Sequence, residues 1–387
     1  MQSAFAMRTA RHHLAFRLAL LAAFAACTEP PTSPAASAVS HSAAAMHTAG
    51  ASATALTSVG HVFVIVLENK GYDSTFGTPS AAPYLADTLV HAGKLLRQYY
   101  GIAHNSLPNY LAMIGGISPT VATQNDCPIY TNFVMLGSTS AGQPIGQGCV
   151  YPARVRTVAN QLEASARTWK GYMEDMGNDP SRESATCGHV PLGAPDVTTN
   201  ATATDQYAQR HDPFVYFHSV LDSPSCAANV VPLSRLAADL SSAATTPNLS
   251  FITPNLCHDG HDHPCANGEP GGLVSADSFL KTWVPRILAS AAYQADGLLI
   301  VTFDEASTSD ASACCGERSG PNVPRAGITG PGGGRIGAVL LSPFITPGSI
   351  SDTPYNHYAL LRTIEDVYGL AHLGYANGSG VMSFVLN

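Results

Sequence analysis

The strongest constraint on the fold is an alternation of short apolar runs with longer segments of helical periodicity. Five runs indicate buried strands: "HVFVIVL", "FVYFHSV", "NLSFIT", "GLLIVTF" and "RIGAVLL". Two other segments, "SADSFLKTWVPRILASAAY" and "YNHYALLRTIEDVYGL", carry apolar residues at steps of three and four, which is typical of helices. Strands that alternate with helices predict an α/β fold with a mostly parallel sheet covered on both faces.

The N-terminus has the pattern of an export signal. Residues 1–27 carry three arginines and no acid before "LALLAAFAAC", and the apolar run is far shorter than the roughly 20 residues of a spanning helix. "FAAC" resembles a lipobox, which would place a lipid anchor at Cys27; ordinary cleavage nearby is the alternative. We expect a secreted, periplasmic or cell-surface lipoprotein, with any membrane attachment through Cys27.

Composition separates a tether from a folded domain after the export signal. Residues 28–58 are rich in Ala, Ser, Thr and Pro, which predicts a disordered tether, and residues 59–387 form the folded domain. Only 12% of the residues are charged and the formal net charge is -8, which argues against a nucleic-acid partner.

Eight cysteines follow Cys27, and an even number in an exported chain predicts disulfides. Short loops favour the pairs Cys127–Cys149 and Cys257–Cys265. The adjacent Cys314 and Cys315 would form a vicinal bridge or pair elsewhere.

Acidic, amide and imidazole groups follow three of the predicted strands. "HVFVIVL" runs into Glu68 and Asn69, "NLSFIT" leads into "HDGHDH", and "GLLIVTF" runs into Asp304 and Glu305. A single acid after a strand is often a turn or a helix cap, but the carboxyl ends of parallel strands meet at one edge of a sheet. Carboxylates gathered there repel one another unless a cation lies among them. We therefore expect a divalent metal ion, with Mg, Ca, Mn, Zn and Fe all open.

Ser106, in "HNSLPNYLAMIGG", is the candidate nucleophile. It precedes a predicted helix with Pro108 in the first turn, where free N–H groups and the helix dipole favour a phosphate oxyanion. A serine hydroxyl beside a metal attacks phosphorus, whereas most serines at such positions only cap the helix.

Together these segments resemble the bacterial phosphoesterase family of secreted acid phosphatases and phospholipases C, within the alkaline phosphatase-like superfamily. The resemblance covers about residues 60 to 370 and rests on a series of motifs in the family's order: "VIVLENKGYD", "HNSLPNYLAMIGG", "WKGYMEDM", "FVYFHSV", "PNLCHDGHD", "VTFDEA" and "YNHYALLRTIED".

The resemblance implies a three-layer α/β/α sandwich and a set of site residues. It implies a metal held by Glu68, Asn69, Asp304 and Glu305, with Ser106 as nucleophile and a phosphoserine intermediate. His261 or His357 would assist the leaving group. The remaining candidates for contacts to phosphate or to a second metal are His104, Asp259, Asp262 and His263.

The resulting prediction is a metal-dependent phosphomonoesterase that acts on a small phosphate ester or a phospholipid head group. A phosphodiesterase of the phospholipase C type is the alternative within the family. A metal-free serine esterase is a rival, although "HNSLP" is no Gly-x-Ser-x-Gly elbow. A non-catalytic surface-binding protein with the same fold is a second rival.

Overall fold

The computed structural model describes residues 56–315 and 319–387. The predicted export signal, Cys27 and almost all of the predicted tether lie outside these residues. No helix in the described part is long and apolar enough to cross a membrane.

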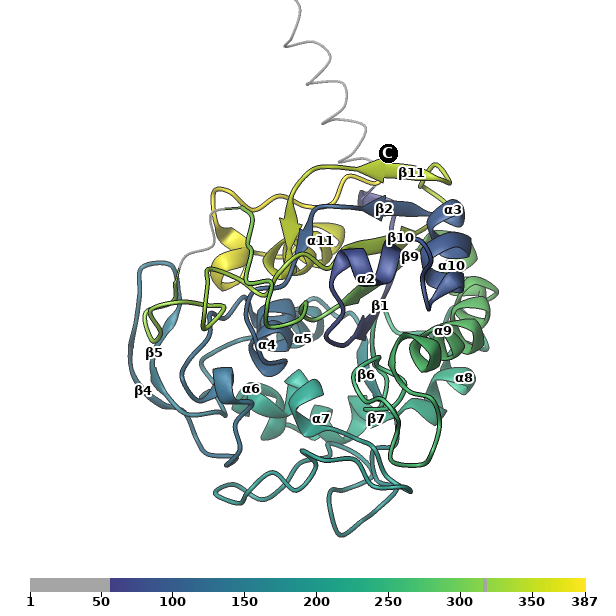
Figure 1. The fold of residues 1–387 in the computed structure, drawn as a ribbon. Helices are drawn as coiled ribbons and strands as arrows, with labels where there is room; N and C mark the ends of the chain where they lie inside the picture. Colours follow the sequence, from purple (N-terminus) through teal and green to yellow (C-terminus); the bar gives the residue numbers. More distant parts are fainter. Residues whose placement is uncertain (1–55, 316–318) are drawn as a thin grey trace, which may run out of the picture. The chain divides into compact units, whose positions relative to one another are not determined.

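The secondary structure follows the predicted alternation of strands and helices (Figure 1). The strands are β1 (His61–Leu67), β2 (Lys94–Leu96), β3 (Tyr99–Tyr100), β4 (Val134–Ser138), β5 (Pro144–Gln147), β6 (Trp169–Met173), β7 (Val230–Pro232), β8 (Leu249–Thr253), β9 (Gly297–Phe303), β10 (Ala338–Leu341), β11 (Ser349–Ser351) and β12 (Tyr355–Asn356). The α-helices are α2 (Tyr72–Phe76), α3 (Val90–Ala92), α4 (Leu107–Gly115), α5 (Val158–Ala164), α6 (His218–Leu221), α7 (Pro224–Asn229), α8 (Leu236–Asp239), α9 (Gly272–Leu288), α10 (Ala291–Asp296) and α11 (His357–Tyr368). The shorter helical turns are η1 (Tyr84–Leu89), η2 (Thr123–Asn125), η3 (Gln209–His211), η4 (Pro213–Tyr216), η5 (Leu233–Arg235) and η6 (Gly374–Asn377).

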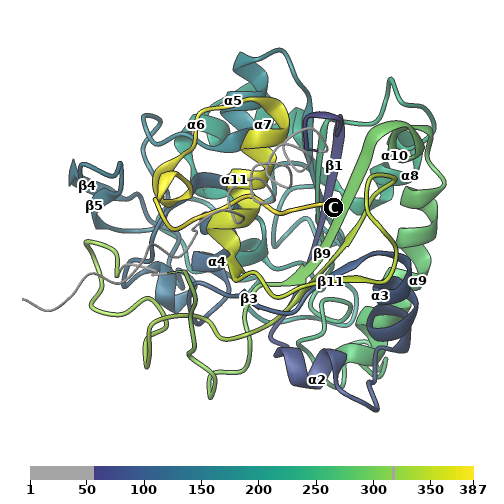
Figure 2. The same cartoon turned by 90° about the horizontal axis from the view of Figure 1, so that it is seen from above.

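Eight strands form the central sheet in the order β11-β2-β10-β9-β1-β8-β6-β7. Every neighbouring pair is parallel except the two that involve β10. Helices α4, α5 and α11 cover one face, and α9 and α10 cover the other (Figures 1 and 2). The predicted α/β fold with a mostly parallel, doubly covered sheet is therefore confirmed.

One predicted strand is wrong. "FVYFHSV" forms the turn η4 and the short helix α6, because Pro213 begins η4 and the carboxylate of Asp212 accepts the backbone N–H of Phe214. A short, fully buried apolar run has no polar alternation, so its periodicity does not distinguish a strand from a helical turn. The predicted long helix is also divided, since α9 ends at Leu288 and Ser290 caps α10.

Disulfides join all eight cysteines of the described residues. The predicted pairs Cys127–Cys149 and Cys257–Cys265 are present, and the vicinal pair Cys314–Cys315 is also bridged. The fourth disulfide joins Cys187 to Cys226.

An ion-paired histidine joins the loops that follow β6 and β8. His258 Nδ1 lies 2.9 Å from Glu174 Oε1, and its Nε2 lies 3.2 Å from Glu269 Oε2. Burial alone lowers the pKa of His258, but its hydrogen bonds to the two carboxylates outweigh this and raise the pKa to about 9. His258 is therefore protonated at neutral pH and holds the two loops together electrostatically.

The first prediction concerns the core strand β1, which lies between β8 and β9. Ile65 is fully buried opposite Ile252 and Val301, so Ile65→Ala should lower the free energy of unfolding by about 2–5 kcal/mol through lost burial and a cavity. Ile350 on the edge strand β11 is 52% exposed, and Ile350→Ala should cost less than about 1 kcal/mol. Denaturant unfolding of both variants checks this; equal losses would show that β1 is not the core strand.

The second prediction concerns the pH dependence of stability. Because the folded-state pKa of His258 is about 9, above the ordinary value of 6.5, its stabilisation is fully present below about pH 6.5 and disappears as the pH rises through 9. His258→Gln should lower the free energy of unfolding by about 2 kcal/mol at pH 6 and by almost nothing near pH 10.

Denaturant titrations at the two pH values test the His258 prediction. The control is His91→Gln, because His91 is an exposed histidine with its own carboxylate partner, Asp87. A loss in His258→Gln that is equal at both pH values would contradict an electrostatic role.

Candidate active site

Ser106 lies at the start of α4, with its hydroxyl turned away from the helix. Its Oγ donates a hydrogen bond to Glu68 Oε2 over 2.7 Å and caps no backbone N–H of α4. The N–H of Leu107 is satisfied instead by Asp126 Oδ1, at 2.9 Å. The hydroxyl is thus available for chemistry among the carboxylates rather than used as a helix cap.

Glu68 is the centre of the hydrogen-bond network. Besides Ser106, its carboxylate accepts from Asn69 Nδ2 and from the hydroxyl of Tyr110, each at 2.8 Å. His211 Nε2 lies 3.3 Å from Glu68 Oε1. The side chain of Glu68 is buried, although it follows β1 where a solvated turn residue would be ordinary.

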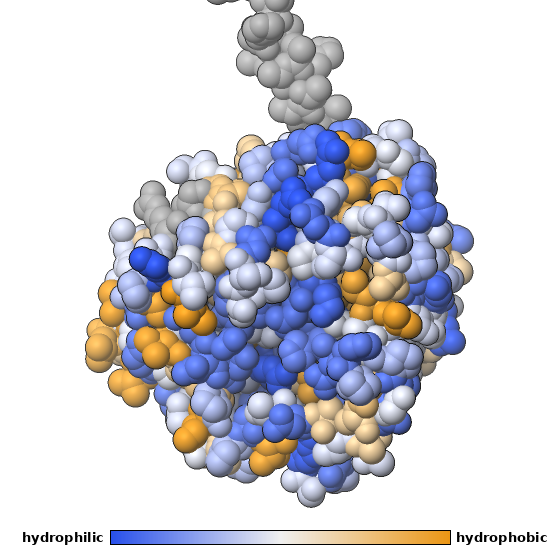
Figure 3. Space-filling model, viewed as in Figure 1, coloured by the Kyte–Doolittle hydropathy of each residue, from blue (hydrophilic) through white to orange (hydrophobic). Residues whose placement is uncertain are grey.

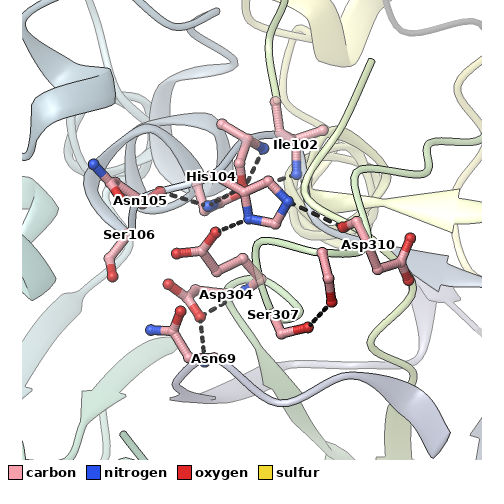
Figure 4. A network of polar contacts seen from close by, with 12 residues as sticks. Asn69, Ile102, His104, Asn105, Ser106, Asp304, Ser307 and Asp310 are labelled. Atoms are coloured by element: carbon pink, nitrogen blue, oxygen red, sulfur yellow. Dashed lines mark hydrogen bonds and ion pairs between the residues drawn. The ribbon is translucent and has the colours of Figure 1, made fainter. Parts of the chain in front are cut away.

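Asp304 extends this network from the end of β9. Its Oδ1 accepts the backbone N–H groups of Asn69, at 3.0 Å, and of Glu305, at 2.6 Å. Its Oδ2 is buried without a hydrogen-bond partner among the described residues. Figure 4 shows the hydroxyl of Ser106 on the same side as the Asp304 carboxylate and the Asn69 amide.

His104 engages Glu305, the fourth predicted metal ligand. Its Nδ1 contacts Glu305 Oε2, and its Nε2 donates to the backbone carbonyl of Asp310 over 3.0 Å (Figure 4). Burial raises the pKa of Glu305 and lowers the pKa of His104, so the pair is favoured in its neutral form. His104 is therefore connected to the site by its contact with Glu305.

Asp259 and His261 bring the loop after β8 to the same site. Asp259 is fully buried, and its Oδ1 accepts the backbone N–H of His261 over 2.7 Å. The ring of His261 is half exposed and its Nδ1 lies 2.8 Å from Asp262 Oδ1. The hydrogen bond with Asp262 raises the pKa of His261, which favours the protonated imidazolium.

Two predicted histidines point elsewhere. His263 Nδ1 donates to the backbone carbonyl of Pro270 over 2.6 Å. His357 donates from Nε2 to the backbone carbonyl of Asp304 over 2.5 Å and accepts at Nδ1 from the Tyr99 hydroxyl over 3.0 Å. Complete burial lowers the pKa of His357 to about 4, which keeps it neutral behind Asp304.

Four site residues escaped the sequence analysis: Tyr110, Asp126, Arg210 and His211. His211 is buried, stacks on Tyr110 with ring centres 5.3 Å apart, and places Nδ1 3.6 Å from Asp259 Oδ2. The buried Arg210 donates to the carbonyl of Thr199, and its Nε lies 4.0 Å from Asp126 Oδ2. The sequence signal for Arg210 and His211 was that these two basic residues directly precede Asp212 and Pro213, a typical turn pair.

The electrostatics of the site favour a cation. Burial raises the pKa values of Glu68, Asp259, Asp304 and Glu305 well above the ordinary range, and mutual repulsion adds to each shift. The orphaned Asp304 Oδ2 and the oxygen-rich donor set around Ser106 fit a hard divalent ion.

The carboxylates are not gathered into a closed ligand shell. Among the described residues, one set of three His, Cys, Asp or Glu ligand atoms lies within 4.8 Å of one another: Cys257, His258 and Glu269. Because Cys257 is in a disulfide, that set is no metal centre. Of the four expected metal ligands, Glu68, Asn69 and Asp304 lie in one hydrogen-bond network, while Glu305 faces His104.

Three phosphatases are similar in sequence to this chain over most of its length. A phosphatidylinositol-3-phosphatase from Mycobacterium tuberculosis is 26% identical over 85% of this chain and 84% of its own. A phosphate-repressible acid phosphatase from Penicillium chrysogenum is 27% identical over 80% of this chain, and an acid phosphatase from Aspergillus fumigatus is 25% identical over 84%. The chain spans only 59% and 58% of these fungal relatives.

The comparison with solved structures finds a protein in the alkaline phosphatase superfamily from Vibrio parahaemolyticus, with a TM-score of 0.47 and 13% identity over 81% of this chain and 67% of the other. A model of the phosphoesterase family matches residues 79–371, most of the described fold. The chain therefore belongs to the phosphoesterase family and is a hydrolase of phosphate ester bonds.

Proposed function

We propose that this protein is an exported, metal-dependent phosphomonoesterase with Ser106 as its nucleophile. The observation that carries the proposal is the hydrogen bond from Ser106 Oγ to the buried carboxylate of Glu68. That bond supports a reacting hydroxyl, because a merely structural serine at this position would cap α4. The names of the relatives, acid phosphatases and a phosphatidylinositol phosphatase, favour a phosphomonoester over a phosphodiester.

The metal would be held by Glu68, Asn69 and Asp304, with Glu305 as the fourth ligand expected from the sequence. Bound there, it would lower the pKa of the serine hydroxyl and neutralise charge on the phosphoryl oxygens. The oxygen donors suit Mg²⁺, Ca²⁺ or Mn²⁺ better than they suit Zn²⁺.

The chain's own residues account for the proton transfers. Ser106 Oγ forms the bond to phosphorus as its proton passes to Glu68 Oε2, and the bond from phosphorus to the leaving oxygen breaks. The imidazolium of His261 gives its proton to that oxygen, which its half-exposed ring and raised pKa favour. Water then attacks the phosphoserine as it gives a proton to His261, the bond from phosphorus to Ser106 Oγ breaks, Glu68 returns its proton to that oxygen, and inorganic phosphate leaves.

His357 receives a different role from the one expected. Because both of its ring nitrogens are hydrogen-bonded inside the protein, we propose that it positions Asp304 rather than protonating a leaving group. We propose that Arg210 and His211, rather than His357, donate hydrogen bonds to the phosphoryl group. Arg210 is charged and buried, and both nitrogens of His211 lack hydrogen-bond partners among the described residues.

Export is proposed from the signal-like N-terminus and supported by the four disulfides, since such bridges persist in oxidising compartments. We also propose that a lipid at Cys27 anchors the exported protein and that a phospholipid head group is one of its substrates.

The third prediction tests the nucleophile and the metal ligands as one unit. Ser106→Ala should lower kcat at least about a thousandfold while the protein keeps its metal, because the carboxylates remain. Asp304→Asn should lose metal and activity together, and the losses should not add in the double variant. The measurements are elemental analysis of each protein and turnover on panels of phosphomonoesters and phosphodiesters.

The control for this experiment is Ser290→Ala, because Ser290 caps α10, which leads into the start of β9, whereas Asp304 follows the other end of that strand. It should keep full activity while losing about 1 kcal/mol of stability. A Ser106→Ala protein with near wild-type turnover would exclude the serine mechanism. Activity that survives removal of all metal would favour the metal-free esterase, and absence of any turnover in the wild type would favour the binding protein.

The fourth prediction concerns recognition of phosphate. Arg210→Gln should raise KM for a phosphomonoester, and the inhibition constant of inorganic phosphate, by about 10–100-fold, since a charge-assisted hydrogen bond is lost. Arg325→Gln is the control, because Arg325 is exposed and bonded only to a loop carbonyl. Unchanged phosphate inhibition in Arg210→Gln would contradict this assignment.

A further inference from the structure

The hairpin of β4 and β5 exposes apolar side chains outside the catalytic site. These strands form a two-stranded sheet of their own, separate from the central sheet. Val134 and Leu136 are 67% and 80% exposed on one face of β4, and that face continues over Ile145 and Pro321. Figure 3 shows hydrophobic side chains gathered at the left edge of the molecule, where Figure 1 places β4 and β5.

A cavity of about 760 Å³ lies on the other side of the same hairpin. Met135 and the turn 140–142 form one wall, and Arg154 and Arg156 form part of another. The cavity also contacts Gly115, at the C-terminal end of α4, whereas Ser106 lies at the N-terminal end. It is therefore a separate site from the catalytic one.

The two arginines have no carboxylate partner among the described residues. Arg154 and Arg156 are exposed, and neither makes a hydrogen bond or ion pair with any described residue. Other arginines, such as Arg97, Arg182 and Arg335, are paired with carboxylates. Two unpaired cations at the rim of one cavity favour an anionic ligand.

We propose that Val134, Leu136, Arg154 and Arg156, the hairpin surface, bind the protein to an anionic lipid bilayer. A headgroup phosphate would enter the cavity between the hairpin and the arginines, while Leu136 and Val134 enter the interfacial region. The apolar side chains lie on one side of the hairpin and the two arginines on the other, so insertion of the hairpin by its edge would bring both groups to the lipid surface. Apolar side chains together with cations are the combination that interfacial binding requires. The inference does not depend on the proposed catalytic mechanism.

A bilayer fits these features better than a protein partner. The apolar side chains belong to a two-stranded hairpin, and a fluid surface accommodates them without matching their shape. A bilayer also supplies many anionic groups to the two arginines, whereas a protein would need acidic side chains at matching positions. Because the whole chain carries a net charge of -8, attraction to anionic lipid has to be local.

The fifth prediction is tested by sedimentation with vesicles of phosphatidylcholine, with or without phosphatidylserine. All proteins carry Cys27→Ser and the same N-terminus, so that a lipid anchor plays no part. The parent protein should sediment with the phosphatidylserine vesicles and much less with the neutral ones. The double variants Arg154→Gln/Arg156→Gln and Val134→Ser/Leu136→Ser should each weaken binding about tenfold or more.

The controls keep the charge and hydropathy changes but move them elsewhere. Arg235→Gln removes an exposed arginine and Ile350→Ser an exposed isoleucine of β11, and both should bind as the parent does. Hydrolysis of soluble p-nitrophenyl phosphate should be unchanged in every variant, which shows that each is folded. Failure of the parent to sediment with anionic vesicles, or parent-like binding of either double variant, would overturn the proposal and leave a protein partner as the explanation.

Discussion

Electrostatic repulsion among four buried carboxyl groups at the edge of the central sheet is the constraint on the site. These groups belong to Glu68, Asp259, Asp304 and Glu305. Glu68 is stabilised by the donors Ser106, Asn69 and Tyr110, all within hydrogen-bond distance. Asp304 receives two backbone N–H groups but keeps one oxygen without a partner among the described residues. Buried like charges are costly unless a cation or protons compensate them. Protons or a cation would relieve this repulsion beside the Ser106 hydroxyl.

The scaffold makes this concentration of charge possible. Strands β1, β8 and β9 run parallel at the centre of the sheet, so the residues that follow them emerge at one edge. The N-terminus of α4 brings Ser106 to that edge, and Asp126 completes the helix start. The disulfide from Cys127 constrains the loop that carries Asp126. Packing of the sheet, rather than local contacts, thus determines how closely the carboxylates approach.

Sequence patterns predicted the elements better than the contacts between them. The runs that became β1, β8 and β9 were identified because they are apolar and end in polar residues, whereas "FVYFHSV" was misassigned because a buried run looks the same in a strand and a helical turn. His211 was missed because it lies in that irregular region, where no periodicity marks a functional side chain. His263 was included as a candidate contact to phosphate or a second metal, but its ring Nδ1 donates to the carbonyl of Pro270.

By itself, the sequence determined the mostly parallel α/β fold, two disulfides and the residues that follow the core strands, because periodicity and chain proximity are local properties. It also placed Ser106 at a helix start. Only the tertiary structure decided that Ser106 faces Glu68, that Glu305 faces His104 and that His357 lies behind Asp304. These contacts join segments up to some two hundred residues apart, and side-chain direction there depends on how the layers pack around the sheet, which no local pattern encodes.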